Sequence, residues 1–469
     1  MKLFRQKTDF SQGAILTLTL VFGAIFVLIF GGLVGFISMQ YKQSNEKVAQ
    51  NEALAVAEAG ANWSRWRMAH SPNDLNFSGT YAYQDPESGT LGHYTIQVAP
   101  SDQCSTIDTI KITGWTDSYP NVKRAVQVQY GQPSMAEYAF MTNANVWFGP
   151  NEVLRGPFHS NGGIRMDGQQ NALATSATST YLCQPMFGCN PAQVKPGIWG
   201  SGNGGTLGLW EFPVTSFNFA SITLDLNTLK TAATTTGYYF GNSGGFGYHV
   251  EFKNNGTFNL YKVTKLKPNV YACDTQGNCG NDSNDIDKET LLGNHALPTE
   301  TCNAKNLIFL EDKKVWVDGV IKGKATVVAA QLPDLDATNA SIIINGNISR
   351  ADPRDTLVAL IAQKNILVPL YAPNVLEIQA VMLAQKGAVQ RLYYDSSNKP
   401  RDILNKISVR GSILSKNTWT WTWIDSHGTV ISGYPNTSSY YEPNLIYSPP
   451  PFFPVSGAQQ FISWTEVPP

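Results

Sequence analysis

The acidic segment CGNDSNDIDKE carries side-chain oxygen atoms at alternating positions, which is the chemistry that binds calcium. The EF-hand pattern is incomplete, because its glycine is missing and the spacing to the last acid is short. The sequence therefore predicts either a calcium site or a solvated acidic loop closed by Cys273 and Cys279. The calcium ligands would be Asp282, Asn284, Asp285, Asp287 and Glu289.

A run of alternating tryptophans, NTWTWTW, places Trp419, Trp421 and Trp423 on one face of a predicted strand. If exposed, the three indoles would form a platform for stacking on sugars or peptides. If buried, they would seal the end of a solenoid, as terminal coils must. The buried arrangement is favoured.

Two catalytic motifs are absent: the sequence has no HExxH and no Walker-type loop. His159, in LRGPFHSNGGIRMDG, is expected to be a turn residue bonded to backbone groups and not a catalyst. Asp352, Arg354 and Asp355 are the compact set that a polysaccharide-cleaving β-helix would use, or else they form a polar loop. The sequence therefore predicts a non-enzymatic protein, with an anchored β-helix enzyme acting on surface polysaccharide as the alternative.

Six cysteines bear on the compartment and on metal binding. The local pairs CQPMFGC and CDTQGNC are not CxxC, and there is no CxxCH, which argues against zinc and haem. An even number of cysteines in an exported chain favours disulfides. Of the fifteen possible pairings we expect Cys104–Cys302, Cys183–Cys189 and Cys273–Cys279.

Composition points to an all-β extracellular protein. Basic and acidic residues are balanced at 34 and 35, so the overall charge gives no reason to expect a nucleic-acid partner. Only 15% of residues are charged, whereas 11% are aromatic. A polar, weakly charged and aromatic-rich chain suits β-structure outside the cell.

The N-terminal region holds an apolar run from Ala14 to Met39, inside a longer stretch without charge from Phe10 to Tyr41. About 20 apolar residues suffice for a helix to span a bilayer. Basic residues in the leader place its N-terminus in the cytoplasm and everything after Lys42 outside. A plain signal anchor would explain this region as well.

Helix-forming residues continue beyond the apolar run. Residues 40–68 contain no proline and a single glycine, Gly60, and include the alanine-rich stretch NEALAVAEAGANW. One helix of roughly 80 Å could therefore run from about residue 14 to about residue 68. Its outer half has small side chains, which permit close packing against copies of itself, so it is expected to lie in a helical bundle.

The leader ending in Gly13, the run AILTLTLVFGAIF and the exit AVAEAGAN resemble the type IV pilin superfamily, above all large PilX-type minor pilins. The resemblance implies that a prepilin peptidase cuts after Gly13 and leaves Ala14 as the first mature residue. Leu18 stands where the family has a glutamate that pairs with the N-terminal amine of a neighbouring subunit. This departure favours a tip or initiating subunit, or a merely anchored relative, over a repeating shaft subunit.

The exported region is predicted to be all-β, with a β-helix favoured over β-sandwich domains. Short apolar runs recur every ~20 to 27 residues, each beside a turn residue, which is typical of one solenoid coil per repeat. The turn residues are Gly319, Gly346, Asn365, Gly387 and Gly411. The expected organisation is a basic leader at 1–13, a transmembrane and stalk helix at 14–70, a small antiparallel head at 71–135, a first coil at 136–168, a Gly/Asn/Ser/Thr-rich insertion with disulfides at 169–306, coils at 307–430 and a Pro-rich strap at 431–469.

These patterns together predict a membrane-anchored, pilin-like minor or tip subunit of a pilus or pseudopilus, acting in assembly or surface adhesion. The expected partners are other pilin-like subunits through the N-terminal helix, the inner or cytoplasmic membrane, and a surface glycan or protein ligand. No nucleic acid is expected. A plain anchored adhesin that joins no pilus is a further alternative.

Overall fold

The structure, a computed structural model, describes residues 12–71, 74–85, 89–102, 104–219, 226–299, 302–353, 356–425, 428–455 and 459–469. These form two compact units. The first, which we call the head unit, comprises the described parts of Met1–Pro100, Asp108–Tyr130 and Phe461–Pro469. The second, the body unit, comprises those of Ser101–Ile107 and Gly131–Gln460. The body is therefore inserted within the sequence of the head.

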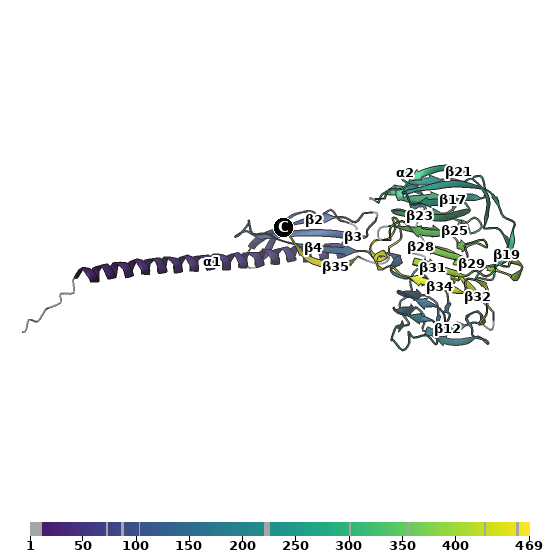
Figure 1. The fold of residues 1–469 in the computed structure, drawn as a ribbon, viewed down its shortest axis with the longest axis horizontal. Coiled ribbons are helices and arrows are strands. Elements are labelled where there is room, and N and C mark those ends of the chain that lie inside the picture. The colour runs from purple at the N-terminus through teal and green to yellow at the C-terminus, as the bar shows by residue number, and fades with distance from the viewer. Residues whose placement is uncertain are drawn as a thin grey trace, which may run out of the picture. The chain divides into compact units, whose positions relative to one another are not determined.

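The head unit begins with one continuous helix, α1 (Gln12–His70), of 59 residues (Figure 1). Absence of proline explains its continuity, because no backbone donor is lost along its length. One long helix followed by an all-β body was the predicted fold class, and the structure confirms it. The helix covers the predicted transmembrane and stalk segment.

A five-stranded sheet completes the head unit, in the order β1-β2-β3-β4-β35. The β1–β2 and β2–β3 pairs are antiparallel, and β3 alternates half-buried and buried residues along its whole length, so one face packs on the core. The last strand comes from the C-terminal region that we had predicted to be a strap. The strands are β1 (Gly79–Asp85), β2 (Gly89–Ala99), β3 (Ile107–Thr116), β4 (Arg124–Gly131) and β35 (Gln460–Val467).

The alanine-rich half of α1 packs against this sheet. Ala53 and Ala57 are fully buried, as are Ile110 and Ile112 of β3. A Cβ atom at Gly114 would overlap the backbone of the helix at both alanines. Small residues on helix and sheet therefore let the two backbones approach closely. We had expected them to face a bundle of other helices, and this expectation is wrong for the buried face.

The body unit is organised around a continuous ladder of parallel strands (Figure 1). Each strand pairs in register and in parallel with the next strand of the ladder, whereas the strands of a β-sandwich are antiparallel. In spatial order the strands are β16 (Tyr238–Phe240), β22 (Leu307–Leu310), β24 (Lys324–Ala329), β26 (Leu357–Ala362), β28 (Val375–Ala384), β31 (Lys406–Ser415), β5 (Phe140–Thr142), β8 (Phe158–Ser160), β11 (Ala174–Ser176) and β15 (Trp210–Glu211).

The spatial order of the ladder is a circular permutation of its sequence order. The earliest strand, β5, pairs with the late strand β31, and the chain then continues through β8 and β11 to β15. From that end it passes to β16 at the opposite end of the ladder. The segment predicted as the first coil, 136–168, therefore adjoins β31 of the segment 307–430.

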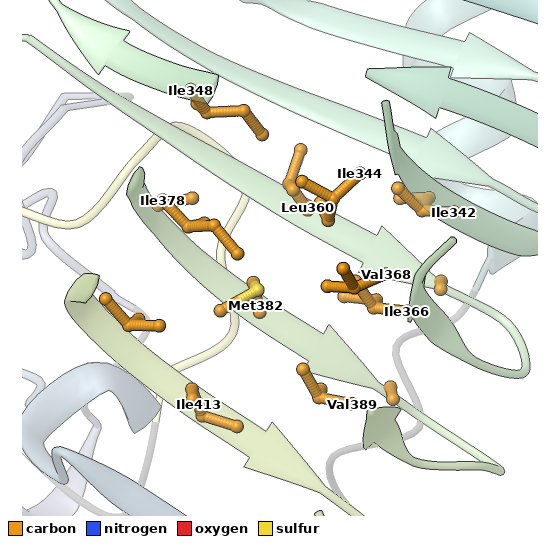
Figure 2. Close-up of a cluster of buried hydrophobic side chains, with 14 of the residues drawn as sticks. Ile342, Ile344, Ile348, Leu360, Ile366, Val368, Ile378, Met382, Val389 and Ile413 are labelled. Atoms are coloured by element: carbon orange, nitrogen blue, oxygen red, sulfur yellow. The ribbon is translucent and has the colours of Figure 1, made fainter. Parts of the chain in front are cut away.

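Inward-facing side chains of the ladder stack on one another and form the core (Figure 2). Leu360, Met382 and Ile413 occupy one register column, which continues into Phe140. All four are buried. Burial of one such aliphatic side chain stabilises a fold by about 1.5–3 kcal/mol, so stacking of repeats supplies the stability that no single repeat could have.

Further parallel pairings extend the body. One series joins β17 (Gly247–Lys253), β23 (Lys314–Ile321), β25 (Ser341–Arg350), β27 (Ile366–Val368) and β29 (Val389–Arg391). A second joins β6 (Val146–Phe148), β9 (Ile164–Met166) and β14 (Ile198–Trp199). Two more pairs are β7 (Val153–Leu154) with β10 (Gln169–Gln170), and β34 (Asn436–Tyr440) with β31.

The body unit also contains antiparallel strand pairs and short helices in addition to the parallel ladders. The antiparallel partners are β18 (Thr257–Leu266) with β17 and β21 (Ile286–Ala296), β12 (Thr180–Cys183) with β13 (Gln193–Pro196), β19 (Val270–Cys273) with β20 (Cys279–Asp282) and β30 (Tyr393–Tyr394), and β32 (Thr422–Ile424) with β33 (Val430–Gly433). The helices are α2 (Leu226–Thr235) and the 3₁₀ turns η1 (Met135–Glu137), η2 (Pro185–Phe187), η3 (Ala304–Asn306), η4 (Ser396–Asn398) and η5 (Pro443–Ile446).

Two predicted segments differ from the structure. The predicted insertion, 169–306, contributes β11, β15, β16 and β17 to the parallel ladders and is therefore no separate insertion. The predicted strap, 431–469, contributes β34 to the body and β35 to the head. Both segments are polar and rich in turn residues, and this composition hid their short strands.

Candidate functional site

The apolar half of α1 is the surface that most clearly needs a partner. Among the described residues, one helix is long and apolar enough to cross a membrane, and its apolar window is not buried. Leu28 is 76% exposed and Val27 is 69% exposed. Exposed apolar side chains in such number mark contact with lipid or with protein.

One face of this apolar half carries a shallow groove. It is lined by residues at the helical spacings i, i+3, i+4, i+7 and i+8, namely Leu20, Gly23, Ala24, Val27 and Leu28. Because Gly23 has no side chain and nothing within 4 Å, it leaves a notch between larger neighbours. Small residues between large ones are the surface that lets a second helix approach closely in a membrane.

The predicted processing site lies at the start of α1. Gly13 and Ala14 belong to the helix, but the Ala14 side chain lies outside the described residues. The leader before them, 1–11, also lies outside. The structure therefore leaves the predicted cleavage between these two residues untested.

The predicted calcium site does not form. Lys314 Nζ lies 2.8 Å from an oxygen of Asp282, and Lys265 Nζ lies 2.6 Å from Asp287. The backbone N–H of Tyr371 donates to Asp285. Glu289 contacts His249, and Asn284 accepts from the Trp316 indole N–H through its backbone oxygen, so the acids of this segment have separate partners. In the part of the chain that the structure describes, no three His, Cys, Asp or Glu side chains are placed to hold a metal ion.

Of the two arrangements considered for the tryptophan run, the favoured buried one is found, and the alternative platform does not form because two of its three rings are buried. Trp419 and Trp421 belong to the core of the body, and Trp419 stacks on Phe140 with 4.9 Å between ring centroids. Trp423 is half-buried and donates its indole N–H to the backbone oxygen of Arg391 at 3.0 Å. The run seals the core instead of offering a surface.

The segment HSNG, residues 159–162, forms the turn between β8 and β9. His159 is buried, with Nδ1 2.9 Å from Thr175 Oγ1 and Nε2 3.0 Å from Asn161 Oδ1, and burial lowers its pKa. Ser160 donates to the backbone oxygen of Ala144 and accepts from the backbone N–H of Gly162. His159 is thus satisfied by side chains rather than by the backbone groups that we expected, and the element fixes a turn.

The remaining predicted residues are accounted for as follows. The structure brings the cysteines together in the pairs Cys104–Cys302, Cys183–Cys189 and Cys273–Cys279, with Cα atoms 5.4, 5.7 and 4.1 Å apart. Of the acid set considered for polysaccharide cleavage, Arg354 and Asp355 lie outside the described residues.

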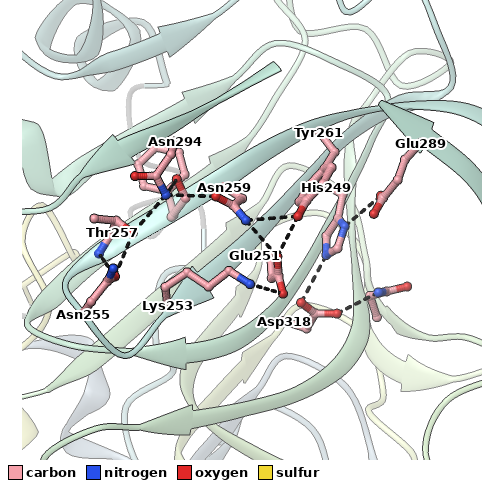
Figure 3. A network of polar contacts seen from close by, with 12 residues as sticks. His249, Glu251, Lys253, Asn255, Thr257, Asn259, Tyr261, Glu289, Asn294 and Asp318 are labelled. Carbon is pink, nitrogen blue, oxygen red and sulfur yellow. Dashed lines mark hydrogen bonds and ion pairs between the residues drawn. The ribbon is translucent and has the colours of Figure 1, made fainter. Parts of the chain in front are cut away.

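A buried polar network in the body was not singled out from the sequence (Figure 3). His249 on β17 is 5% exposed and lies between two carboxylates, with Nδ1 2.9 Å from Glu289 and Nε2 3.1 Å from Asp318. Burial alone would lower the pKa of His249, but the hydrogen bonds that its ring donates to Asp318 and Glu289 raise it to about 9. The alternation of polar side chains in GYHVEFK, on one face of β17, was the available signal.

The comparisons with known proteins are sparse. No protein-family model and no curated protein matches the chain. Among solved structures it is similar to the competence-associated pilin ComZ from Thermus thermophilus, with 12% identity, a TM-score of 0.30, and coverage of 89% of this chain and 98% of that one. At this identity and TM-score the similarity supports no inference about fold or function.

Proposed function

We propose that the chain is a pilin-like subunit that is anchored in a membrane by α1 and assembles through that helix with other pilin-like subunits. One observation carries the proposal. A single continuous helix is apolar and exposed over its first half and packs against its own sheet over its second half. Such a helix leaves its apolar half available to lipid before assembly and to neighbouring helices after it.

The groove at Gly23 supports assembly beyond anchoring. Lipid chains need no notch, whereas a second helix gains close contact from one. The leader, Gly13 and the exit sequence AVAEAGAN resemble those of type IV pilins, which agrees with this role. Leu18 in place of the usual glutamate favours a minor or tip position of the PilX type, in a pilus or pseudopilus.

The proposed work of the body is structural: it presents a surface outside the membrane for assembly or adhesion, and catalyses nothing. Incubation of the full-length protein with polysaccharides should therefore release no oligosaccharide. Release of fragments would favour the alternative of an anchored β-helix enzyme.

Association with filaments tests the assembly proposal. Surface filaments sheared from cells that produce the full chain together with a type IV pilus system should contain it, at low abundance relative to the main subunit. Gly23→Leu fills the notch and should reduce this association by at least fivefold. Gly32→Leu is the matched control, because Gly32 also has nothing within 4 Å and lies about 180° around the helix.

Absence of the chain from filaments, with normal amounts in the membrane, would contradict assembly and leave a plain anchored adhesin. Equal effects of the two leucine variants would contradict the particular role of the groove.

A further inference from the structure

We propose that a cleft in the body unit binds a carboxylate-bearing sugar, a uronic or sialic acid. The cleft has a volume of ≈ 520 Å³, and its lining includes Trp147, Pro150, Arg165, Asp167, Trp199 and Ser201. Ligand sites of small molecules fall in this range of volume. The inference uses the body unit alone, so it does not depend on the role proposed for α1.

Strand register builds the centre of the cleft. Trp147 on β6 and Trp199 on β14 both pair with Arg165 on β9, which lies between them. The guanidinium carbon of Arg165 is 4.2 Å from the ring centroid of Trp147 and 5.0 Å from that of Trp199. Parallel stacking thus creates a row in which one cation is flanked by two indoles.

Asp167 holds the guanidinium in place. Its Oδ2 accepts from Arg165 Nε at 2.7 Å and from the Trp147 indole N–H at 2.8 Å. Its Oδ1 accepts from the backbone N–H and the hydroxyl of Ser201 at 2.9 and 3.0 Å. Burial raises the pKa of Asp167, but the bonds from Ser201 and Trp147 and the charge of Arg165 outweigh it and hold the pKa below its usual range. With four bonds already accepted, this carboxylate orients Arg165 and is not itself a ligand for sugar.

Arg165 retains capacity to bind an anion. Besides the bond to Asp167, its Nη1 donates to the backbone oxygen of Phe187 at 3.0 Å. These contacts fix the plane of the guanidinium, whose fork suits a planar carboxylate. Lys195 Nζ lies 4.7 Å from the ring centroid of Trp199 and adds positive charge beside the cleft. Since Asp167 balances Arg165, the local surplus is a single positive charge, which matches one carboxylate.

The walls suit a sugar ring. Both indole N–H groups are already bonded, that of Trp147 to Asp167 and that of Trp199 to the hydroxyl of Tyr181 at 2.9 Å. The indole carbon that Arg165 and Lys195 leave uncovered is apolar and suits the C–H groups of a pyranose. The exposed Ser201 hydroxyl lies at the same cleft and can accept a hydrogen bond from a sugar hydroxyl.

The surroundings make the site rigid. Tyr181, Cys183, Phe187 and Cys189 form a small buried cluster on which Trp147 and Trp199 pack. The Cys183–Cys189 disulfide closes this loop. A preorganised site loses less conformational entropy on binding. A nucleic acid would instead require a row of cations along its phosphates, whereas this cleft has a single surplus charge.

The test uses the full-length protein in detergent micelles and titration calorimetry at low salt. The probes are trigalacturonate and sialyllactose, with methyl-esterified trigalacturonate and lactose as neutral counterparts of similar shape. We expect at least one acidic probe to bind with a Kd of about 1 mM or tighter. Its neutral counterpart should bind at least tenfold more weakly, and the acidic probe that binds identifies the source of the carboxylate.

Variants locate the binding. Arg165→Gln should weaken the acidic probe at least tenfold. Arg155→Gln is the matched control, because Arg155 lies 5.2 Å from the ring centroid of Tyr440 in the same unit but does not line the cleft, and it should leave binding unchanged. If Arg165→Gln does not fold, Lys195→Glu reverses the charge at the rim and should weaken binding at least fivefold. No binding of either acidic probe, equal binding of a neutral counterpart, or unchanged binding in Arg165→Gln and Lys195→Glu would overturn the proposal.

Discussion

Loss of the proton from His249 should make the body unit less stable as pH rises from neutral to alkaline. Both ring nitrogens of His249 lie within hydrogen-bond distance of a carboxylate, and only the protonated ring can donate from both. In the unfolded chain its pKa would be the ordinary 6.5, whereas in the fold it is about 9. The folded state therefore keeps a proton that the unfolded state loses.

The magnitude follows from linkage. A rise in pKa from 6.5 to about 9 corresponds to about 3 kcal/mol of stability, present in full below pH 6.5 and lost as pH rises through 9. Between these limits the free energy of opening should fall by about 1.4 kcal/mol per pH unit. His249 is buried, so solvent screens this interaction little.

Hydrogen exchange of β17 and β23, corrected for the pH dependence of intrinsic exchange, is the assay. Protection should fall by about two orders of magnitude between pH 6.5 and 9 in the wild type. His249→Asn should lose stability at pH 6 and lose the slope. His295→Asn should keep it, because His295 has a pKa lowered by burial and titrates below this window. The same slope in His249→Asn, or no slope in the wild type, would refute the reasoning.

Three further outcomes follow from the packing and the polar contacts. Gly114→Ala should destabilise the head unit by about 1–3 kcal/mol in urea unfolding, because the added Cβ would overlap the backbone of α1. Gly280→Ala is the control: a Cβ there would meet nothing within 4 Å, so the free energy of unfolding should change by less than about 0.5 kcal/mol. Ser160→Ala should cost the body about 1–3 kcal/mol in the same measurement, since two half-buried backbone groups lose their partner; a neutral result would contradict the role assigned to the HSNG segment. Thermal unfolding should be unchanged by millimolar calcium or by a chelator, because the acids of the CGNDSNDIDKE segment point to separate partners; a calcium-dependent rise in Tm would contradict this arrangement.

Local patterns in the sequence predicted the elements whose signal is local. The long helix follows from an uninterrupted run of helix formers, and the later parallel strands follow from the recurring apolar runs. Gly319 and Gly411, which were predicted as turn residues, lie instead inside β23 and β31. Both glycines adopt positive φ, at 105° and 137°, and a Cβ there would overlap the strand of the neighbouring coil. Here the amino-acid type and the backbone requirement agree.

Long-range order could not be predicted in the same way. Pairing of β5 with β31 joins residues far apart in sequence, and nothing near Phe140 or Ile413 specifies the other as its neighbour. The same holds for β35, which completes the head sheet from the C-terminal region. Such pairings are selected by the shape and apolar surface of the whole ladder, which become visible only when the repeats are stacked.

Long-range strand pairing also explains why the predicted calcium site does not form and why the cleft around Arg165 could not be predicted from the sequence. A row of acids in sequence predicted calcium, but the strands that surround it supply a separate cation or donor to its members. The row of Trp147, Arg165 and Trp199 forms only because three separate strands stack in register. The acids that are neighbours in the sequence thus have separate partners in the fold, whereas the residues of the Trp147, Arg165 and Trp199 row come together from distant parts of the sequence.

The central claim is that α1 is a pilin-like helix, and the N-terminus of the mature protein tests it most directly. The full chain should be co-expressed with a prepilin peptidase that is shown to cut a known substrate in the same cells, and its intact mass measured. A chain that begins at Ala14 is the predicted result. An uncut chain that begins at Met1 would contradict the pilin reading, and α1 would then be a plain anchor below a surface β-structure.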